Sequence, residues 1–127
     1  MNNLTDKLKN EAKQVSNNAY TVYSKFNVGA AVLTESGKIY TGVNVENVSY
    51  GATVCAERNA IFHAVGDGER KFTHIAVFNE KQLPVPCGMC LQVMSEFAPL
   101  IKVTLFSNTE EKETSLDELL PNPFKMV

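Results

Sequence analysis

Two short segments contain residue types that could bind a metal ion and move a proton. The first reads Cys-Ala-Glu at 55–57, and the second reads Pro-Cys-Gly-Met-Cys at 86–90. Three thiolates on zinc leave the fourth tetrahedral position open for water, as in catalytic zinc sites. Glu57 follows Cys55 by two residues, so its carboxylate could carry protons between water and a substrate without binding the metal. We therefore predict a catalytic zinc site with Cys55, Cys87 and Cys90 as ligands and Glu57 as the catalytic residue.

Both segments are expected at the N-terminus of a helix. Residues 55–65 place small and apolar side chains at helical spacing, with Gly66 as the C-cap. Pro86 is expected in the first turn of a second helix that reaches Phe97. A helix N-terminus lowers the pKa of a thiol, which favours metal binding. Because three thiolates exceed the charge of Zn²⁺ by one, we expect Arg58 to donate a hydrogen bond to a ligating sulfur.

The remaining elements follow from hydrophobic spacing and turn residues. Strands that alternate with helices in the second half of the chain favour parallel pairing. The predicted fold class is α/β, with helices covering a mixed sheet. The expected elements are an amphipathic helix over 4–20, a hairpin of 28–33 and 38–43 with Gly37 at positive φ, strands 73–78 and 101–106, and a short helix begun by a Ser115-x-x-Glu118 capping box and ended by Pro121.

Length and composition limit the number of domains, the location and the kind of substrate that we expect. The 127 residues predict a single domain over 1–127. The sequence shows no apolar run of membrane-spanning length and no signal peptide at its start, so the expected location is cytoplasmic. The net charge is −2, and no segment concentrates Lys and Arg. A nucleic-acid substrate is therefore disfavoured, and a small molecule is expected.

Other interpretations of the same cysteines are possible. A C-x-x-C pair alone also occurs in structural zinc sites and redox pairs, and an isolated Cys55 could be a core residue. A redox role leaves Cys55 and Glu57 unexplained. A non-catalytic zinc module that binds a partner protein needs a fourth protein ligand. The candidates are His63, within a helix, and His74, at the start of a strand, but both are expected to have ordinary structural roles.

Three further segments, together with the two cysteine motifs, resemble those of a known protein family over nearly the whole chain. They are YSKFNVGAA at 23–31, GVNVEN at 42–47 and ELLPNPF at 118–124. Together they resemble the small homotetrameric zinc-dependent cytidine deaminases, whose zinc motifs have this pattern. The resemblance implies hydrolytic deamination of cytidine and deoxycytidine to uridine and deoxyuridine, with release of ammonia, in pyrimidine salvage. It also implies a three-layer sandwich in which helices flank a mixed five-stranded sheet.

The resemblance assigns substrate-binding roles to several positions. It implies that Phe26 stacks on the pyrimidine, that Asn44 and Glu46 bind the ribose hydroxyls, and that backbone groups at Ala56 contact the amide edge of the base. An amide and a carboxylate two residues apart on a strand would share one face, which agrees with this assignment.

In the family, neighbouring chains complete each site of the homotetramer, and Tyr50 and Phe124 are the positions that would be shared here. The family usually has Arg directly after the last cysteine, where this chain has Leu91, whereas Gln92 is kept. We expect Gln92 and Arg58 to support the zinc ligands. Because Leu91 replaces the Arg of the family, Arg58 is the cation expected beside the thiolates.

The main rival is a related deaminase of another cytosine-bearing small molecule, such as blasticidin S. Such enzymes share the zinc motifs, so only Asn44 and Glu46 favour a nucleoside as the substrate.

Overall fold

The computed structural model describes residues 3–126, which form a mixed sheet with helices on both of its faces. The helices and strands are α1 (Asn3–Val15), β1 (Gly29–Thr34), β2 (Ile39–Val43), α2 (Ala56–Gly66), β3 (Phe72–Phe78), α3 (Gly88–Phe97), β4 (Lys102–Phe106), β5 (Glu111–Ser115) and α4 (Leu116–Leu119), with short 3₁₀ turns at Ser16–Asn18 and Tyr50–Ala52. Within residues 3–126, no helix is both long enough and apolar enough to cross a membrane.

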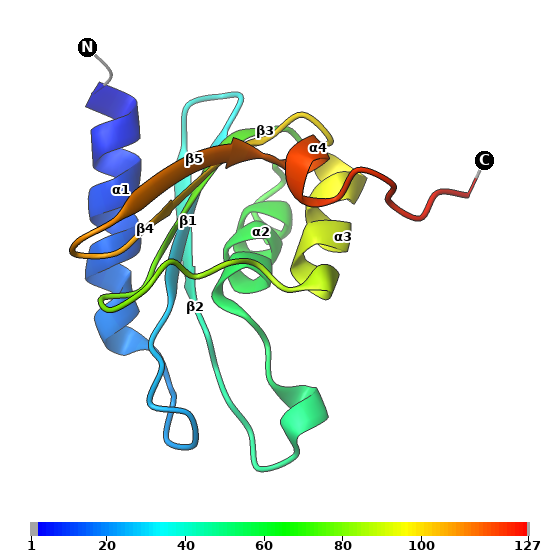
Figure 1. Ribbon diagram of the computed structural model, residues 1–127. Helices are drawn as coiled ribbons and strands as arrows, with labels where there is room; N and C mark the ends of the chain where they lie inside the picture. The colour runs from blue at the N-terminus through cyan, green and yellow to red at the C-terminus, as the bar shows by residue number, and fades with distance from the viewer. Residues whose placement is uncertain (1–2, 127) are drawn as a thin grey trace.

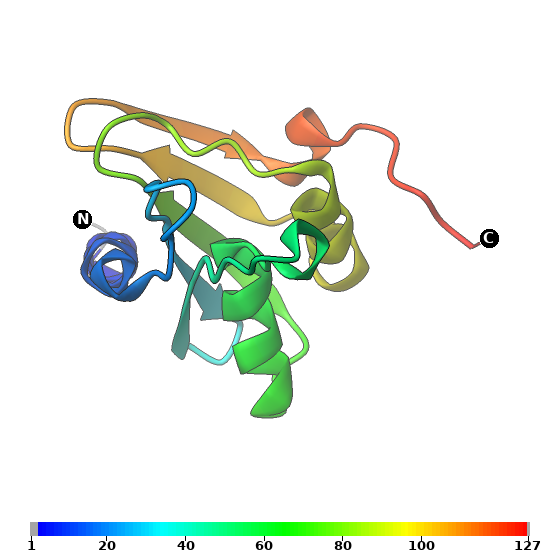
Figure 2. The same cartoon turned by 90° about the horizontal axis from the view of Figure 1, so that it is seen from below.

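The sheet has five strands in the order β2-β1-β3-β4-β5. Strands β3 and β4 are parallel, and the other neighbours are antiparallel. Helix α1 covers one face, and α2 and α3 cover the other (Figures 1 and 2). The predicted fold class, the mixed five-stranded sheet and the parallel pairing in the second half of the chain are thus confirmed.

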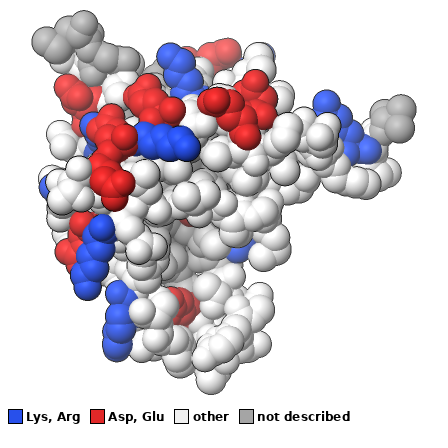
Figure 3. Space-filling view, in the orientation of Figure 1, with Lys and Arg blue, Asp and Glu red and all other residues white. Residues whose placement is uncertain are grey.

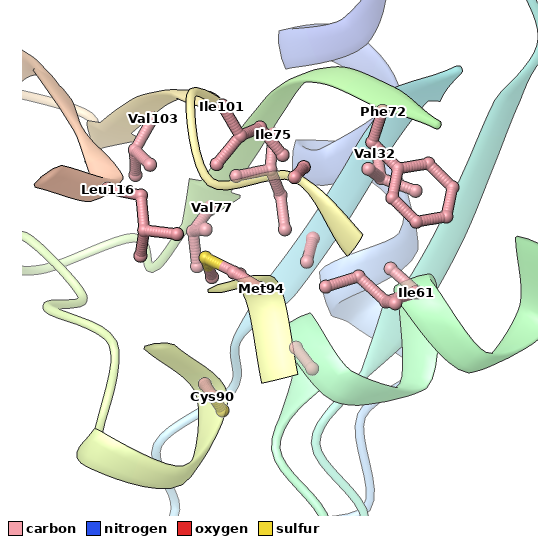
Figure 4. Packing of buried hydrophobic residues seen from close by; sticks show 14 of the residues in the cluster. Val32, Ile61, Phe72, Ile75, Val77, Cys90, Met94, Ile101, Val103 and Leu116 are labelled. Atoms are coloured by element: carbon pink, nitrogen blue, oxygen red, sulfur yellow. The ribbon is translucent and has the colours of Figure 1, made fainter. Parts of the chain in front are cut away.

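Two hydrophobic clusters hold the layers together. The larger cluster lies between the sheet and α2 and α3, where Ile61 and Met94 pack against strand residues such as Ile75 and Val77 (Figure 4). The smaller cluster joins α1 to the opposite face through Leu8 and other side chains. Alternate strand residues enter the two clusters, as the pleat of a strand requires.

Two glycines permit close contact between helices and sheet. A Cβ atom on Gly42 of β2 would lie 2.3 Å from the Ala60 nitrogen and 2.6 Å from the Ala56 oxygen of α2. A Cβ atom on Gly29 of β1 would lie 2.0 Å from the Ala12 oxygen of α1. Glycine at 42 therefore lets β2 rest on the backbone of the first turns of α2, which contain Glu57.

The structure corrects the predicted extent of the first helix. Helix α1 ends at Val15 rather than at residue 20. The Ser16 hydroxyl donates to the Lys13 carbonyl (2.6 Å), and Ala19 is extended. Polar side chains at 16–18 compete for backbone hydrogen bonds, so the apolar spacing that continues to Ala19 does not continue the helix.

Strand β5 was not predicted from the pattern of the chain. It contains Glu-Lys-Glu-Thr-Ser and forms the edge of the sheet, with its first three residues exposed. An edge strand of this kind has no apolar alternation, which is the signal that sequence analysis uses.

Several helix ends also differ from the prediction. Gly66 is the last residue of α2, Asp67 is the C-cap, and it is Gly68 that adopts positive φ, at 95°. The prediction of positive φ at Gly37 is confirmed. Pro86 precedes the N-cap of α3 and is therefore outside the first turn.

The predicted capping box of α4 does not form. Ser115 is the N-cap, but its side chain makes no hydrogen bond to a backbone amide of the helix. Its hydroxyl donates instead to the Glu118 carboxylate at 3.3 Å. The short helix still ends before Pro121, as expected.

Candidate active site

Three thiols converge between the N-termini of α2 and α3. Cys55 and Cys87 are the N-caps of these helices, and Cys90 lies in the first turn of α3. The Sγ atoms of Cys55 and Cys87 are 3.8 Å apart, those of Cys87 and Cys90 are 3.6 Å apart, and all three lie within 4.8 Å of one another. Zinc–sulfur bonds of about 2.3 Å in a tetrahedral site place sulfurs about 3.8 Å apart. The three thiols therefore fit a zinc ion.

The charge around the thiols also favours a cation. A hydrogen bond with the Cys90 thiol, followed by the Arg58 guanidinium, lowers the pKa of Cys55 to about 5. The same contact with Cys55, together with burial, raises the pKa of Cys90. A thiolate forms readily at Cys55, and its negative charge opposes ionisation of Cys90, which a divalent cation would offset. Arg58 Nη2 donates to Cys55 Sγ at 3.5 Å, the contact expected from the sequence.

Glu57 places a buried carboxyl group beside the thiols. It lies in the first turn of α2 and is only 4% exposed. Burial, with a smaller contribution from the charge of Cys55, raises the pKa of Glu57 to about 7. No metal-ligand group other than the three cysteines forms such a cluster within residues 3–126, so His63 and His74 lie outside it.

A cavity of about 410 Å³ opens onto Cys55, Cys87 and Glu57, whereas Cys90 is fully buried and does not line it. Apolar side chains form most of its wall, with two amides (Asn44 and Gln82) and one carboxyl group (Glu57) among them, as in sites for small organic molecules. The lining residues are Phe26, Val28, Asn44, Cys55, Ala56, Glu57, Gln82, Leu83, Pro84, Val85 and Cys87. The structure thus brings Phe26, Asn44 and Ala56 together with the cysteines and Glu57.

Asn44 fixes the wall of the cavity that contains Phe26. Its Oδ1 accepts from the Val28 amide at 2.9 Å, and its Nδ2 donates to the Phe26 carbonyl at 2.8 Å. Lys25, with φ of 60°, turns the chain just before Phe26. Strand β2 ends at Val43, so the expectation that Asn44 and Glu46 lie on one strand face is wrong.

Glu46 and Tyr50 line a separate hollow of about 380 Å³. The Glu46 carboxylate accepts from the amides of Tyr23 (3.1 Å) and Ser24 (3.0 Å) and from the Ser24 hydroxyl, and these bonds lower its pKa. Tyr50 is 77% exposed and meets the Tyr23 ring edge-on. Within one chain, these two residues are not in the cavity with Glu57.

Gln92 and Phe124 lie in a third hollow, of about 690 Å³, between α3 and the C-terminal segment. The Gln92 amide donates to the Phe124 carbonyl (3.0 Å) and accepts from its backbone amide (3.2 Å). Phe124 is 72% exposed. Leu91, in place of the Arg of the family, is buried in the larger core cluster. Although this hollow is larger, it contains neither thiols nor Glu57, so we place the candidate site in the 410 Å³ cavity.

Sequence analysis did not single out the loop between β3 and α3 as part of the site. Residues 82–85 of this loop line the cavity, and Asn79 at its start is buried. The sequence offers one indication that the loop belongs to the site, which is its position directly before the predicted zinc ligand Cys87.

Comparisons with known proteins agree with this geometry. The model of a family described as the cytidine and deoxycytidylate deaminase zinc-binding region matches residues 2–107. A cytidine deaminase from Sporosarcina psychrophila is 47% identical over 124 residues, which cover 94% of this chain and 90% of the relative. The crystal structure of cytidine deaminase from Burkholderia pseudomallei superimposes with a TM-score of 0.89 at 44% identity, covering 94% of this chain and 98% of that one. A blasticidin-S deaminase from Bacillus cereus is 36% identical over 107 residues, covering 77% of this chain and 76% of the relative.

Proposed function

The chain belongs to the cytidine and deoxycytidylate deaminase family, and from this membership we propose that it hydrolyses cytidine and deoxycytidine to uridine and deoxyuridine. In this reaction the bond from C4 of the base to its amino group is broken, a bond from C4 to a water oxygen is formed, and ammonia leaves. The observation that carries the proposal is the cluster of three thiols beside the buried Glu57 carboxyl, with Cys55, Cys87 and Glu57 lining one cavity.

Cys55, Cys87 and Cys90 would hold the zinc ion. When bound, zinc lowers the pKa of a water molecule and so supplies the nucleophile. Glu57 would take one proton from water at its carboxylate and deliver it to the ring nitrogen N3. It would then take the remaining proton from the hydroxyl group added at C4 and pass it to the departing amino group. Its position in the first turn of α2, beside the thiols and on the cavity wall, supports this role. Arg58 holds the Cys55 sulfur in place.

The cavity residues would orient the nucleoside. Phe26 stacks on the pyrimidine, and the backbone at Ala56 binds the amide edge of the base. Asn44 retains one amide hydrogen and one oxygen lone pair for a ribose hydroxyl after its two backbone contacts. Glu46 lies outside this cavity, in the hollow of about 380 Å³. A carboxylate accepts about four hydrogen bonds, so Glu46, which already accepts three, retains one for a sugar hydroxyl that reaches it there.

Assembly into a homotetramer would bring Tyr50 and Phe124 to the sites of neighbouring copies. Both side chains are largely exposed in the single chain, as are Val48, Met89 and Met126. Figure 3 shows charged side chains gathered over α1 and the β4–β5 edge, whereas the part of this face formed by α3 and residues 44–55 is mostly uncharged. Uncharged, partly apolar surface of this kind favours association between copies.

The wider context follows from the same chemistry. The cavity is lined by loops and helix starts that connect the strands and helices of one sheet, which supports a single catalytic domain over residues 1–127. A site that needs three reduced thiols suits the reducing cytoplasm, where the enzyme would act in pyrimidine salvage.

A substrate panel tests the proposal. Zinc-loaded protein is incubated with cytidine, deoxycytidine, blasticidin S or a cytosine-containing single-stranded oligonucleotide, and ammonia is measured. We expect release from the two nucleosides, at a value of kcat/KM well above that for the other two substrates. Preference for blasticidin S, or for the oligonucleotide, would contradict the proposed substrate class.

A further inference from the structure

Asn79 contacts two segments that contribute to the cavity wall, residues 26–28 and the loop that contains 82–85, although it does not line the cavity itself. It follows β3 directly, is 2% exposed, and its backbone amide donates to the Phe106 carbonyl at 3.2 Å. Its side chain is therefore held at the end of two central parallel strands, where ligand-binding crevices of α/β sheets commonly lie.

The donor end of the Asn79 side chain holds the wall that contains Phe26. Asn79 Nδ2 donates to the Asn27 carbonyl at 2.7 Å. The neighbouring Phe26 carbonyl and Val28 amide are both bonded to Asn44. Two amide side chains thus fix three successive residues, and the outer two line the cavity.

The acceptor end of the same side chain holds the start of the loop whose residues 82–85 form another part of the wall. Asn79 Oδ1 accepts from the amides of Lys81 (2.9 Å) and Gln82 (3.1 Å). These two bonds turn the loop just before residues 82–85, which line the cavity. The loop then leads through Pro86 to the ligand Cys87.

We propose that Asn79 is a positioning residue that sets the separation between the Phe26 wall and the 82–85 wall, and so the fit of the pyrimidine ring. This inference rests on the proposed function, because it assumes that the base occupies this cavity. A side chain that donates to one wall and accepts from the other fixes their separation more tightly than either contact alone.

Two variants separate the two ends of the side chain. Asn79→Asp keeps an acceptor for Lys81 and Gln82 but loses the donor to Asn27, and Asn79→Leu loses both. We expect KM for cytidine to rise about fivefold in Asn79→Asp, as for the loss of one buried hydrogen bond, and at least about tenfold in Asn79→Leu. In Asn79→Asp, kcat per bound zinc should change less than about threefold.

Two controls distinguish positioning from general stability. Thr34 is also buried and binds backbone, through the Lys38 amide at 2.9 Å, but lies at the far end of β1 from the cavity. Thr34→Val should lower the unfolding temperature and leave KM unchanged. In a Phe26→Leu background, Asn79→Asp should raise KM less than about twofold, because the wall residue through which it acts is already altered.

The outcomes are separable. A parent protein that releases no uridine from cytidine overturns the proposed function, and this inference with it. An active parent, combined with an Asn79→Asp variant that is less stable but has unchanged KM, overturns the inference alone. Equal effects of Asn79→Asp with and without Phe26 also overturn it.

Discussion

Replacing Gly42 with alanine should displace the helix that carries the site. The added Cβ atom would lie 2.3 Å from the Ala60 nitrogen and 2.6 Å from the Ala56 oxygen, whereas ordinary contacts begin at 3.4 Å. The β2–α2 separation must therefore grow by about 1 Å, and both partners are backbone, which cannot rotate away. Overpacking of this kind typically costs about 1–3 kcal/mol. For a domain of this size, we expect the unfolding temperature to fall by about 4–12 °C.

The same displacement should weaken zinc binding. Cys55 is the N-cap of α2, whereas Cys87 and Cys90 belong to the start of α3, so movement of α2 alone separates one ligand from the other two. A shift of about 1 Å is large beside a zinc–sulfur bond of about 2.3 Å. We expect Gly42→Ala to lose zinc to a chelating dye at lower dye concentration than the parent, and to lose activity in proportion.

Gly66→Ala is the matched control, because Gly66 ends the same helix and a Cβ atom there would meet nothing within 4 Å. Alanine is favoured over glycine in helices by up to about 1 kcal/mol, so this variant should be as stable as the parent or slightly more so. A Gly42→Ala protein with the unfolding temperature and zinc retention of the parent would refute the reasoning.

Three further predictions concern single side chains. Arg58→Ala should weaken zinc binding about 10–100-fold in chelator competition, because it removes the hydrogen bond to Cys55 Sγ. Burial lowers the pKa of His74, so the unfolded chain binds a proton more readily and stability should decline as pH falls through about 6.5. His74→Gln should flatten this decline when unfolding in urea is followed at pH 7 and pH 5. Gln92→Ala should release the backbone at Phe124, which weakens self-association in light scattering and raises KM for cytidine if Phe124 completes a neighbouring site.

Each of these three predictions has a result that contradicts it. Unchanged zinc affinity in Arg58→Ala would remove its proposed role, whereas partial rescue by Arg58→Lys would support it. A decline between pH 7 and pH 5 that is equally steep with and without His74 would assign the effect to other groups. Normal assembly and normal KM in Gln92→Ala would show that the Phe124 contact does not organise the tail.

The chemistry of the site was predictable because it depends on residue types at short spacings. The Cys-x-Glu and Cys-x-x-Cys segments, each expected at a helix start, indicate the ligands and the neighbouring carboxyl through local spacing alone. The contacts of Gly42 and Asn79 were not predictable, because they join residues that lie far apart in the chain. The contact of Gln92 with Phe124 was not predictable for the same reason, since the two residues lie 32 positions apart.

The fold could be predicted where apolar spacing is strong. The prediction failed where polar side chains determine the secondary structure. Strands β1 to β4 follow from their apolar runs, whereas β5 is a charged edge strand with no such signal. Helix α1 ends early because Ser16 bonds to the backbone of the preceding turn. The Ser115 and Glu118 pair satisfies the capping-box pattern, yet the hydroxyl binds the carboxylate instead of a backbone amide.

The central claim is that Glu57 moves the protons of a hydrolytic deamination at a site held by the three cysteines. The most direct test measures uridine and ammonia released from cytidine by the parent and by Glu57→Gln, with bound zinc quantified in both. The prediction is equal release of uridine and ammonia by the parent, and a loss of about 10²–10⁴-fold in kcat for Glu57→Gln with zinc retained. Turnover by Glu57→Gln at the rate of the parent, or no turnover by a zinc-loaded parent, would contradict the claim.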